Sequence, residues 1–338
     1  MSLGRSKTVH PRRKHSERRE NDTAFVPESI KGTTKHHHSS GAAPQSNSRA
    51  SNSRRGDAKR ATGTLETMAS EQTAISSSDK PVTVDSLVVD LRRLGIGEGD
   101  IVIVHSSLSA LGWVSGGAQA VVEALLDTVG SAGTVVMPTQ SGQLSDPAAW
   151  SDPPVPPAWV PVIRTSLPAY DPYLTPTRSM GQVVECFRQH RQTFRSAHPT
   201  ASFAANGAKA QAIISSHPLT PSLGETSPLG RLYDLDAMVA LLGVGHSRNT
   251  SLHLAEYRAV WAGKATYTDG VPVVVDGKRA WVRYDDVVPD DHDFEQIGAA
   301  FAETGHERSG SIGAGVGRVC RQRTLVDFAT RWICENRS

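Results

Sequence analysis

Two side chains able to exchange a proton, His253 and Glu256, stand three residues apart. If a helix begins at Asn249 or Thr250, both side chains lie on one face of it. A carboxylate that holds one imidazole nitrogen leaves the other free to accept a proton, and a nearby helix N-terminus favours the neutral ring. The two residues therefore have the composition of a general base. Most pairs at this spacing are surface pairs worth only a few tenths of a kcal/mol, so the surrounding elements must distinguish the two interpretations.

The residues before this pair predict a strand, a glycine-rich loop and a helix. Residues 237–242 form an apolar run, and Gly243 and Gly245 follow it directly. This order places the pair at the C-terminal end of a buried strand, which is where open α/β sheets bind their ligands.

The apolar run 101–104 predicts a second buried strand. Directly after it come His105 and the four residues Ser106, Ser107, Leu108 and Ser109. Three hydroxyls and several backbone N–H groups form a donor cluster that suits a phosphate or the carbonyls of pantetheine. The alternatives are a polar loop with capping serines, or a nucleophile at Ser106 or Ser107 with His253 as its base. The Gly-x-Ser-x-Gly turn typical of many serine hydrolases is absent.

The remaining elements indicate one large α/β domain over residues 81–338. Helices are predicted over 82–94, 118–129, 181–189 and 325–334, with shorter ones within 207–216, from 227 and before 303. A strand is predicted at 134–137 and a β-hairpin at 265–284, around Asp276 and Gly277. The proline-rich segment, residues 138–176, lacks a regular pattern, and such a long irregular stretch is usually a binding loop or lid.

Charge divides the chain. Residues 1–67 carry 14 Lys and Arg against 6 Asp and Glu, a net charge of +8, so the rest of the chain carries −6. Residues 1–80 are predicted to be a disordered tail, because they cannot bury enough apolar surface to offset the entropy of ordering. The tail could be a nucleic-acid-binding arm, a transit-like segment or an upstream extension with translation starting at Met68. We favour the last, with no requirement for nucleic acid.

Several classes of protein are excluded by composition. No apolar run approaches the ~20 residues needed to cross a bilayer, and no secretory leader is evident. The three cysteines form neither a metal motif nor an even disulfide set, which favours the reducing cytoplasm. The spacings of His105, His198 and His253 match no standard zinc site, so no metal is predicted.

Two further stretches have both a purely structural and a functional interpretation. The glycine-rich stretch 311–317, which includes Gly313, is either a flexible connector or a place where backbone approaches a ligand closely. The acidic stretch 285–295 is either a solvated face or a source of field that attracts a cationic substrate.

Taken together, these segments resemble the aminoglycoside 3-N-acetyltransferase family of antibiotic N-acetyltransferases. The matching pieces, in the family's order, are 105–112, 116–117, 195–202, 224–229, 249–256, 293–298 and 325–328. Each is unspecific alone, but the ordered set is specific and extends over residues 80–338. The tail matches nothing in the family.

The resemblance implies a central mixed sheet flanked by helices, unlike the Gcn5-type fold. It implies acetyl transfer from acetyl-CoA to the 3-amino group of a 2-deoxystreptamine ring, and hence antibiotic resistance. The family's catalytic histidine maps onto His253 and its orienting carboxylate onto Glu256. Transfer is expected to be direct, without an acyl-enzyme. The alternative is the same chemistry on another amine in biosynthesis, because the proline-rich segment departs from the family's pattern.

The resemblance and the donor cluster together give the remaining site residues. For acetyl-CoA these are Ser106, Ser107, Leu108, Ser109, Thr250 and Gly313. For a polycationic aminoglycoside they are Asp171, Glu225, Asp293 and Glu295, part of an acidic cleft that would also draw on Asp146 and Asp152. A homodimer is compatible with the sequence, which does not fix the number of subunits.

Overall fold

The structure is a computed structural model that describes residues 71–76 and 78–338. The described residues belong to one compact unit of the chain, Ala58–Ser338. The predicted disordered tail and the proposed start at Met68 lie mainly outside the described residues, so both stay predictions.

The main sheet has the strand order β3-β4-β2-β1-β5-β9-β8. Its strands are β1 (Ile101–Ser106), β2 (Thr134–Pro138), β3 (Phe194–Arg195), β4 (Phe203–Gly207), β5 (Met238–Leu242), β8 (Arg308–Ile312) and β9 (Gly315–Arg321). β1 runs parallel to both β2 and β5, whereas β4 and β9 pair antiparallel with β2 and β5. The sheet is therefore mixed, as the family resemblance implies.

Strand β1 is at the centre because its residues are apolar on both faces. Val102 and Val104 enter one hydrophobic cluster and Ile103 enters the other, as alternate strand residues must. The chain leaves β1 for β2 on one side and later returns as β5 on the other side. The C-terminal ends of β1 and β5 thus form the topological switch point at which such sheets bind ligands.

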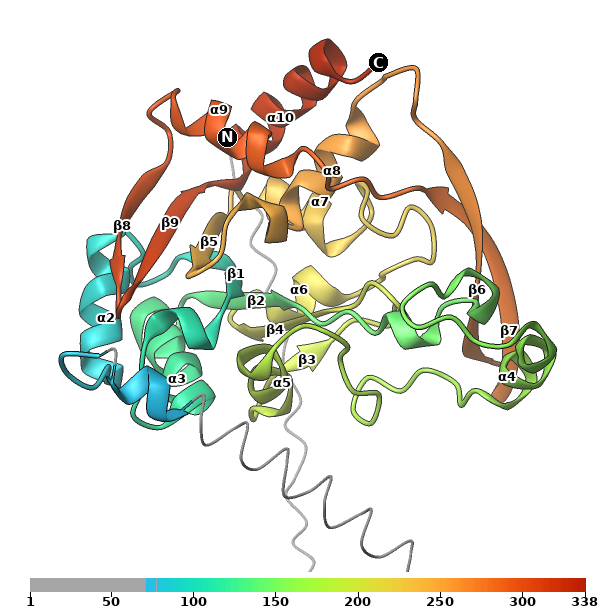
Figure 1. The fold of residues 1–338 in the computed structure, drawn as a ribbon, viewed down its shortest axis with the longest axis horizontal. Coiled ribbons are helices and arrows are strands. Elements are labelled where there is room, and N and C mark those ends of the chain that lie inside the picture. The colour runs from blue at the N-terminus through green and yellow to red at the C-terminus, as the bar shows by residue number, and fades with distance from the viewer. Residues whose placement is uncertain (1–70, 77) are drawn as a thin grey trace, which may run out of the picture. The chain divides into compact units, whose positions relative to one another are not determined.

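Helices cover both faces of the sheet (Figure 1). On the face of Val102 and Val104 lie α2 (Val84–Arg93), α3 (Gly117–Val129) and α5 (Gln182–Gln189). On the opposite face lie α6 (Ala210–Ile214), α7 (Pro228–Asp234), α8 (Ser251–Arg258), α9 (Phe294–Ala302) and α10 (Gln322–Asn336). These helices agree with the predicted ones to within a few residues.

A two-stranded sheet, β6 (Thr266–Val275) and β7 (Lys278–Val287), forms the predicted hairpin. Asp276 and Gly277 both have positive φ, which the tight turn requires. The hairpin lies beside the proline-rich segment, as Figure 1 shows near α4 (Val160–Ser166). The backbone N–H of Tyr170 donates to Pro272 O at 3.0 Å, and that of Asp146 donates to Asp269 Oδ1 at 2.9 Å.

Short 3₁₀ helices interrupt the loops. They are η1 (Leu108–Leu111), η2 (Gly142–Leu144), η3 (Pro147–Ala149), η4 (Pro157–Trp159) and η5 (His246–Arg248). Among the described residues, no helix combines the length and apolar character that a membrane crossing requires.

Strands β3, β8 and β9 were not predicted from the sequence. The glycine-rich stretch 311–317 contains the end of β8, the turn at 313–314 and the start of β9, so it is a paired hairpin and not a flexible connector. A Cβ at Gly313, where φ is +56°, would lie 2.4 Å from the Leu111 carbonyl oxygen, and one at Gly317 would lie 2.5 Å from Leu94 Cδ1. Glycine is therefore needed where this hairpin packs closely against η1 and the end of α2.

Candidate active site

Two loops pack against each other at the C-terminal ends of β1 and β5. The N–H of Ser107 donates to the carbonyl of Leu242 at 3.0 Å, which continues the ladder beyond the strands. Gly243 has a φ of +71°, and a Cβ there would lie 2.7 Å from the Cβ of Ala110. No larger residue fits at 243, because the β5 loop lies directly on η1.

The first turn of α8 is held by two side chains. The N-cap residue of α8 is Thr250, one of the two predicted candidates, and its side chain makes no capping bond; the side-chain oxygen of Asn249, the other candidate, accepts the N–H of Ser251 at 3.1 Å. The N–H of Thr250 donates to Nε2 of His105 at 3.0 Å, which connects β1 to α8. Burial, followed by the nearby His246 and His253, lowers the pKa of His105 to about 3. His105 is therefore uncharged near neutral pH.

Within α8 the predicted pair is formed. Nδ1 of His253 lies 2.5 Å from Oε2 of Glu256, whose side chain is 1% exposed, while the His253 side chain is 14% exposed. A carboxylate only accepts, so Nδ1 carries the proton and Nε2 keeps its lone pair. The imidazole also packs against Phe294 of α9, with ring centroids 4.9 Å apart. Such a ring can accept a proton on Nε2.

The other oxygen of Glu256 has two further donors. Oε1 accepts from the N–H of Asp290 at 3.1 Å and from Nη1 of Arg337 at 2.6 Å. Arg337 also donates to both carboxylate oxygens of Asp293, at 2.8 Å and 2.5 Å. A buried carboxylate is tolerated when donors and opposite charge satisfy it in this way.

The serines after β1 lie in different surroundings. The Ser106 hydroxyl is buried and has no hydrogen-bond partner among the described residues, whereas the hydroxyls of Ser107 and Ser109 lie 3.2 Å apart. Within that same part of the chain, neither Ser106 nor Ser107 is hydrogen-bonded to a histidine. A Ser–His nucleophile pair is therefore not assembled, and the hydroxyls remain as donors for a ligand.

Three other residues predicted to contact acetyl-CoA have structural partners. The side chain of Leu108 packs on the hydrophobic cluster beneath η1. Gly313 donates its N–H to Asp90 Oδ2 at 3.0 Å. Because the N–H of Thr250 is already used by His105, it is not a free donor for an oxyanion.

The four carboxylates predicted to bind substrate differ in their charge balance. Glu225 forms an ion pair with Arg258, and Asp293 forms one with Arg337, so both are largely neutralised. Asp171 accepts the backbone N–H groups of residues 173 and 174, and Glu295 accepts from the backbone and side chain of Ser247; neither carboxylate forms an ion pair within the described part of the chain. Asp146 is neutralised by Arg164. Of the four, Asp171 and Glu295 are therefore the carboxylates whose negative charge can attract a cation.

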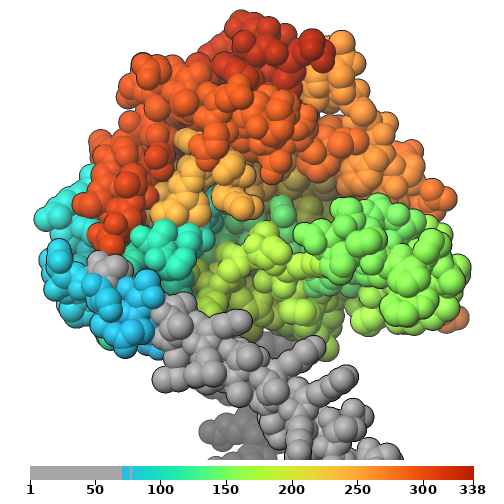
Figure 2. Space-filling view, in the orientation of Figure 1, coloured from blue at the N-terminus to red at the C-terminus, as the bar shows by residue number. Residues whose placement is uncertain are grey.

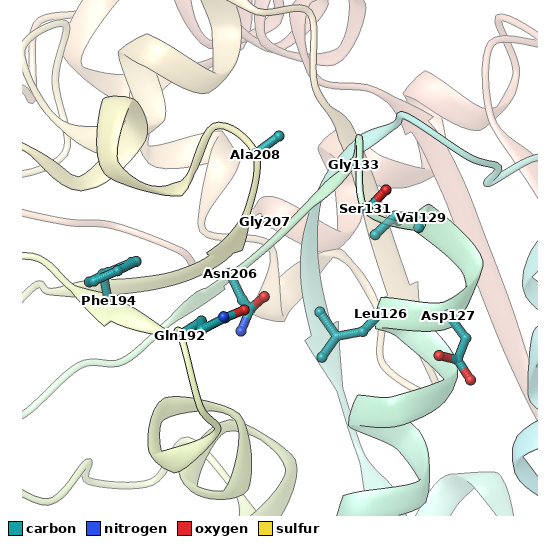
Figure 3. A pocket seen from close by; sticks show the side chains of 11 residues that line it. Leu126, Asp127, Val129, Ser131, Gly133, Gln192, Phe194, Asn206, Gly207 and Ala208 are labelled. Carbon is teal, nitrogen blue, oxygen red and sulfur yellow. The ribbon is translucent and has the colours of Figure 1, made fainter.

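The face drawn in Figure 2 is hollowed between α9 with its neighbours (orange) and the proline-rich segment (green). A different hollow, of about 810 Å³, lies where α3 ends and β2 begins, at the opposite end of the strands from His253. Figure 3 shows Gln192 and Asn206 close together on its wall, with Asp127 pointing away from them. It contains no histidine and is separate from the His253 site.

Two contacts of this site were not found by sequence reasoning. Arg337 is 81 residues from Glu256, and no local pattern links them. His105 was identified only as the start of a hydroxyl-rich loop, not as the acceptor that fixes Thr250. In residues 71–76 and 78–338, no group of three or more His, Cys, Asp or Glu side chains is arranged to hold a metal ion.

A family model described as aminoglycoside 3-N-acetyltransferase matches residues 103–334. The chain is 44% identical over 265 residues to the SPbeta prophage-derived aminoglycoside N(3')-acetyltransferase-like protein YokD of Bacillus subtilis, covering 78% of this chain and 97% of that protein. It is 36% identical over 285 residues to aminoglycoside N(3)-acetyltransferase VII of Streptomyces paromomycinus, covering 78% and 96%.

Solved structures of similar proteins have the same fold as this chain. The YokD crystal structure superposes with a TM-score of 0.77 at 43% identity, covering 78% of this chain and 98% of that one. AAC-IIIb, solved as a binary complex with CoASH, has a TM-score of 0.69 at 30% identity, covering 77% and 98%. AAC-VIa bound to sisomicin has a TM-score of 0.69 at 30% identity, covering 77% and 100%.

Proposed function

Because the chain belongs to the aminoglycoside 3-N-acetyltransferase family and is an acyltransferase, we propose that it transfers the acetyl group of acetyl-CoA to the 3-amino group of a 2-deoxystreptamine aminoglycoside. Membership of the family supports aminoglycoside acetylation and antibiotic resistance as its general role. One similar protein was solved with CoASH bound and another with the aminoglycoside sisomicin bound, and we propose that this chain binds both kinds of ligand.

One observation carries the proposed mechanism. The His253 Nδ1–H is held by a buried carboxylate at 2.5 Å, and Nε2 keeps a free lone pair. An aminoglycoside amine is mostly protonated at neutral pH and must lose a proton before it can attack. His253 takes that proton on Nε2, directly or through a water, and Glu256 stabilises the imidazolium that results.

Acetyl-CoA supplies an activated acyl carbon and a thiol leaving group. The amine nitrogen forms a C–N bond to that carbon while the C–S bond breaks. Two protons leave the ammonium group: the first passes through His253 to solvent before attack, and the second, released as the amide forms, is taken by His253 and given to the departing thiolate. The developing negative charge on the carbonyl oxygen requires a preorganised donor. We assign this role to donors of the loop 106–109 that a ligand can reach, and not to the Ser106 hydroxyl, which is buried in the structure. Ser107 and Ser109 supply further hydroxyls for the polar groups of the CoA chain.

The amine would enter from the side of the proline-rich segment. Arg195 of β3 holds that segment: its guanidinium donates to Thr139 O and Thr175 O of the segment, and to the Ser202 hydroxyl just before β4. Asp171 on this segment and Glu295 on α9 keep their charge and would attract a polycation. Location in the cytoplasm, independence from nucleic acid and any homodimer stay predictions.

The test is acetylation of kanamycin or gentamicin, with the mass gain of one acetyl group and its position assigned. His253→Ala should lower kcat at least ~10²-fold, because it removes the base, while acetyl-CoA affinity stays close to wild type. If no deoxystreptamine compound is acetylated but another amine is, the substrate assignment is wrong and the biosynthetic alternative holds. Removal of residues 1–67 should leave turnover unchanged. Loss of function on that deletion would instead favour a role for the basic tail.

A further inference from the structure

Arg337 lies just beyond α10 and fills the space between two buried carboxylates. Its side chain is 4% exposed, and those of Glu256 and Asp293 are 1% and 4% exposed. Nη1 is 2.6 Å from Glu256 Oε1, while Nε and Nη2 contact the two oxygens of Asp293. The guanidinium also lies 5.2 Å from the centroid of the Trp261 ring.

We propose that Arg337 is a positioning residue of the acetyl-transfer site: it fixes the Glu256 carboxylate against His253 and offsets its charge, so that the imidazole stays unprotonated and able to accept. The catalytic meaning of this inference rests on the proposed function. The physical effect on His253 does not, since it can be measured without any substrate.

Geometry supports the positioning role. Oε2 of Glu256 faces His253, and Oε1 faces Arg337 and the N–H of Asp290. Without Arg337, only the single bond from Asp290, at 3.1 Å, would hold Oε1 in place. Arg337 also binds Asp293 at the beginning of α9, the helix whose Phe294 packs on the His253 ring. One side chain therefore fixes both the carboxylate behind the base and the helix beside it.

The charges of the cluster support the other role of Arg337, which is to offset the negative charge of Glu256. Glu256 and Asp293 together carry two negative charges, and Arg337 carries one positive charge. Burial would lower the pKa of Arg337, but hydrogen bonds with Asp293 and Glu256 outweigh it and raise that pKa, so the guanidinium stays charged. With a neutral His253 the cluster holds one net negative charge, which the incoming proton cancels. Without Arg337 it would hold two, and the extra negative charge would favour binding of a proton before substrate arrives.

Other titratable groups also lie near this cluster. They are His105 of β1, Lys264 after α8, Asp290 before α9 and His292, whose Nε2 lies 3.9 Å from Asp293 Oδ2. His105 has a pKa of about 3 and is neutral in the working range, so it adds no charge. Asp290 has its own partner in His292, at 2.6 Å. Arg337 is the cation in direct contact with Glu256.

The experiment is an NMR titration of the His253 ring in the full chain without ligand, with His253→Gln used to assign its signal. Arg337→Met should raise the pKa of the ring by about 1 unit, the size of shift that one close charge produces. Asp293→Asn should move it in the opposite direction, because it removes a negative charge. Arg337→Lys should stay near the wild-type pKa but lose kcat, since lysine keeps the charge without the planar fork. Arg331→Met, an exposed change on α10 with the same loss of charge, is the control and should shift nothing.

Kinetics give the second readout. The acidic limb of the kcat/KM profile should move to higher pH in Arg337→Met, with activity partly recovered at alkaline pH and the KM for acetyl-CoA unchanged. A titration of His253 that is the same in wild type and Arg337→Met would overturn the inference. If that variant does not fold, an unchanged or raised pKa in Asp293→Asn overturns it equally. If the proposed function is wrong, the result is different. His253→Ala would then keep full turnover, while Arg337→Met and Asp293→Asn would still shift the pKa of the His253 ring.

Discussion

Replacing Glu256 by glutamine tests the proton arrangement on His253 while the shape of the side chain is preserved. The amide can be placed in two ways. If its carbonyl faces His253, its NH₂ group meets two further donors, Arg337 Nη1 and the N–H of Asp290, and each unsatisfied buried donor costs about 1–3 kcal/mol. The reverse placement avoids this cost and points the NH₂ group at His253.

That reverse placement moves the imidazole proton. Nδ1, at 2.5 Å from the side chain of residue 256, must then accept instead of donate, so the ring proton moves to Nε2. Nε2 is the nitrogen that is needed to take the proton of the amine. We expect Glu256→Gln to lower kcat about 10²-fold, equivalent to about 2.7 kcal/mol in the activation free energy. The loss should be smaller than for His253→Ala, because a minor population of the correct tautomer remains.

Release of the CoA thiol under saturating acetyl-CoA and an aminoglycoside gives kcat directly. The variant should keep its acetyl-CoA affinity, because Glu256 lies behind the base and not among the serines after β1. Its thermal midpoint should fall by only a few degrees, since Arg337 keeps its pair with Asp293. A folded variant with kcat within threefold of wild type would show that the dyad does not set the tautomer used in catalysis.

Three further perturbations follow from the packing. Stability should fall as pH drops below about 6.5, because three buried histidines have lowered pKa values and the unfolded chain binds more protons there. They are His105 at about 3, His198 at about 4 and His217 at about 3. A thermal midpoint that is flat between pH 6.5 and 4 would contradict this. Gly243→Ala should destabilise by about 1 kcal/mol or more and reduce kcat, because of its positive φ and the clash with Ala110. Gly277→Ala, with a similar φ but no atom within 4 Å, should cost less and leave kcat unchanged when the two are compared by denaturant unfolding. Arg195→Met should raise the KM for the amine more than that for acetyl-CoA, since it frees the proline-rich segment; equal changes in both would argue against a substrate role for that segment.

The main elements of the fold are readable because their signals are local. Thr83 and Ser86 form a complete capping box at the start of α2, and Ser227 with Pro228 starts α7. Strand β1 carries valines on one face and isoleucine on the other, so both of its faces are apolar, and this pattern already indicates a central strand. Strands β8 and β9 were missed because glycines dilute their β-branched residues. Those glycines are required by contacts with Leu94 and Leu111, which lie more than 200 residues away.

The acidic cleft also depends on contacts between residues that are far apart in the sequence. The sequence locates carboxylates but cannot assign their partners. Asp293 was expected to attract a substrate, and the structure places it against Arg337. Asp171 was grouped with it, yet Asp171 accepts only backbone N–H groups and keeps its charge. Which acids remain available to a cation therefore depends on which arginines fold onto them.

By itself the sequence determined the spacing of His253 and Glu256, the strand and loop before them, and the helix that puts both on one face, because these depend on residues a few positions apart. Only the tertiary structure decided that Arg337 and the N–H of Asp290 hold the second oxygen of Glu256, and that His105 fixes the first turn of α8. Those contacts join segments 34 to 145 residues apart. Their formation depends on how helices pack across the sheet, and no periodicity along the chain encodes that packing.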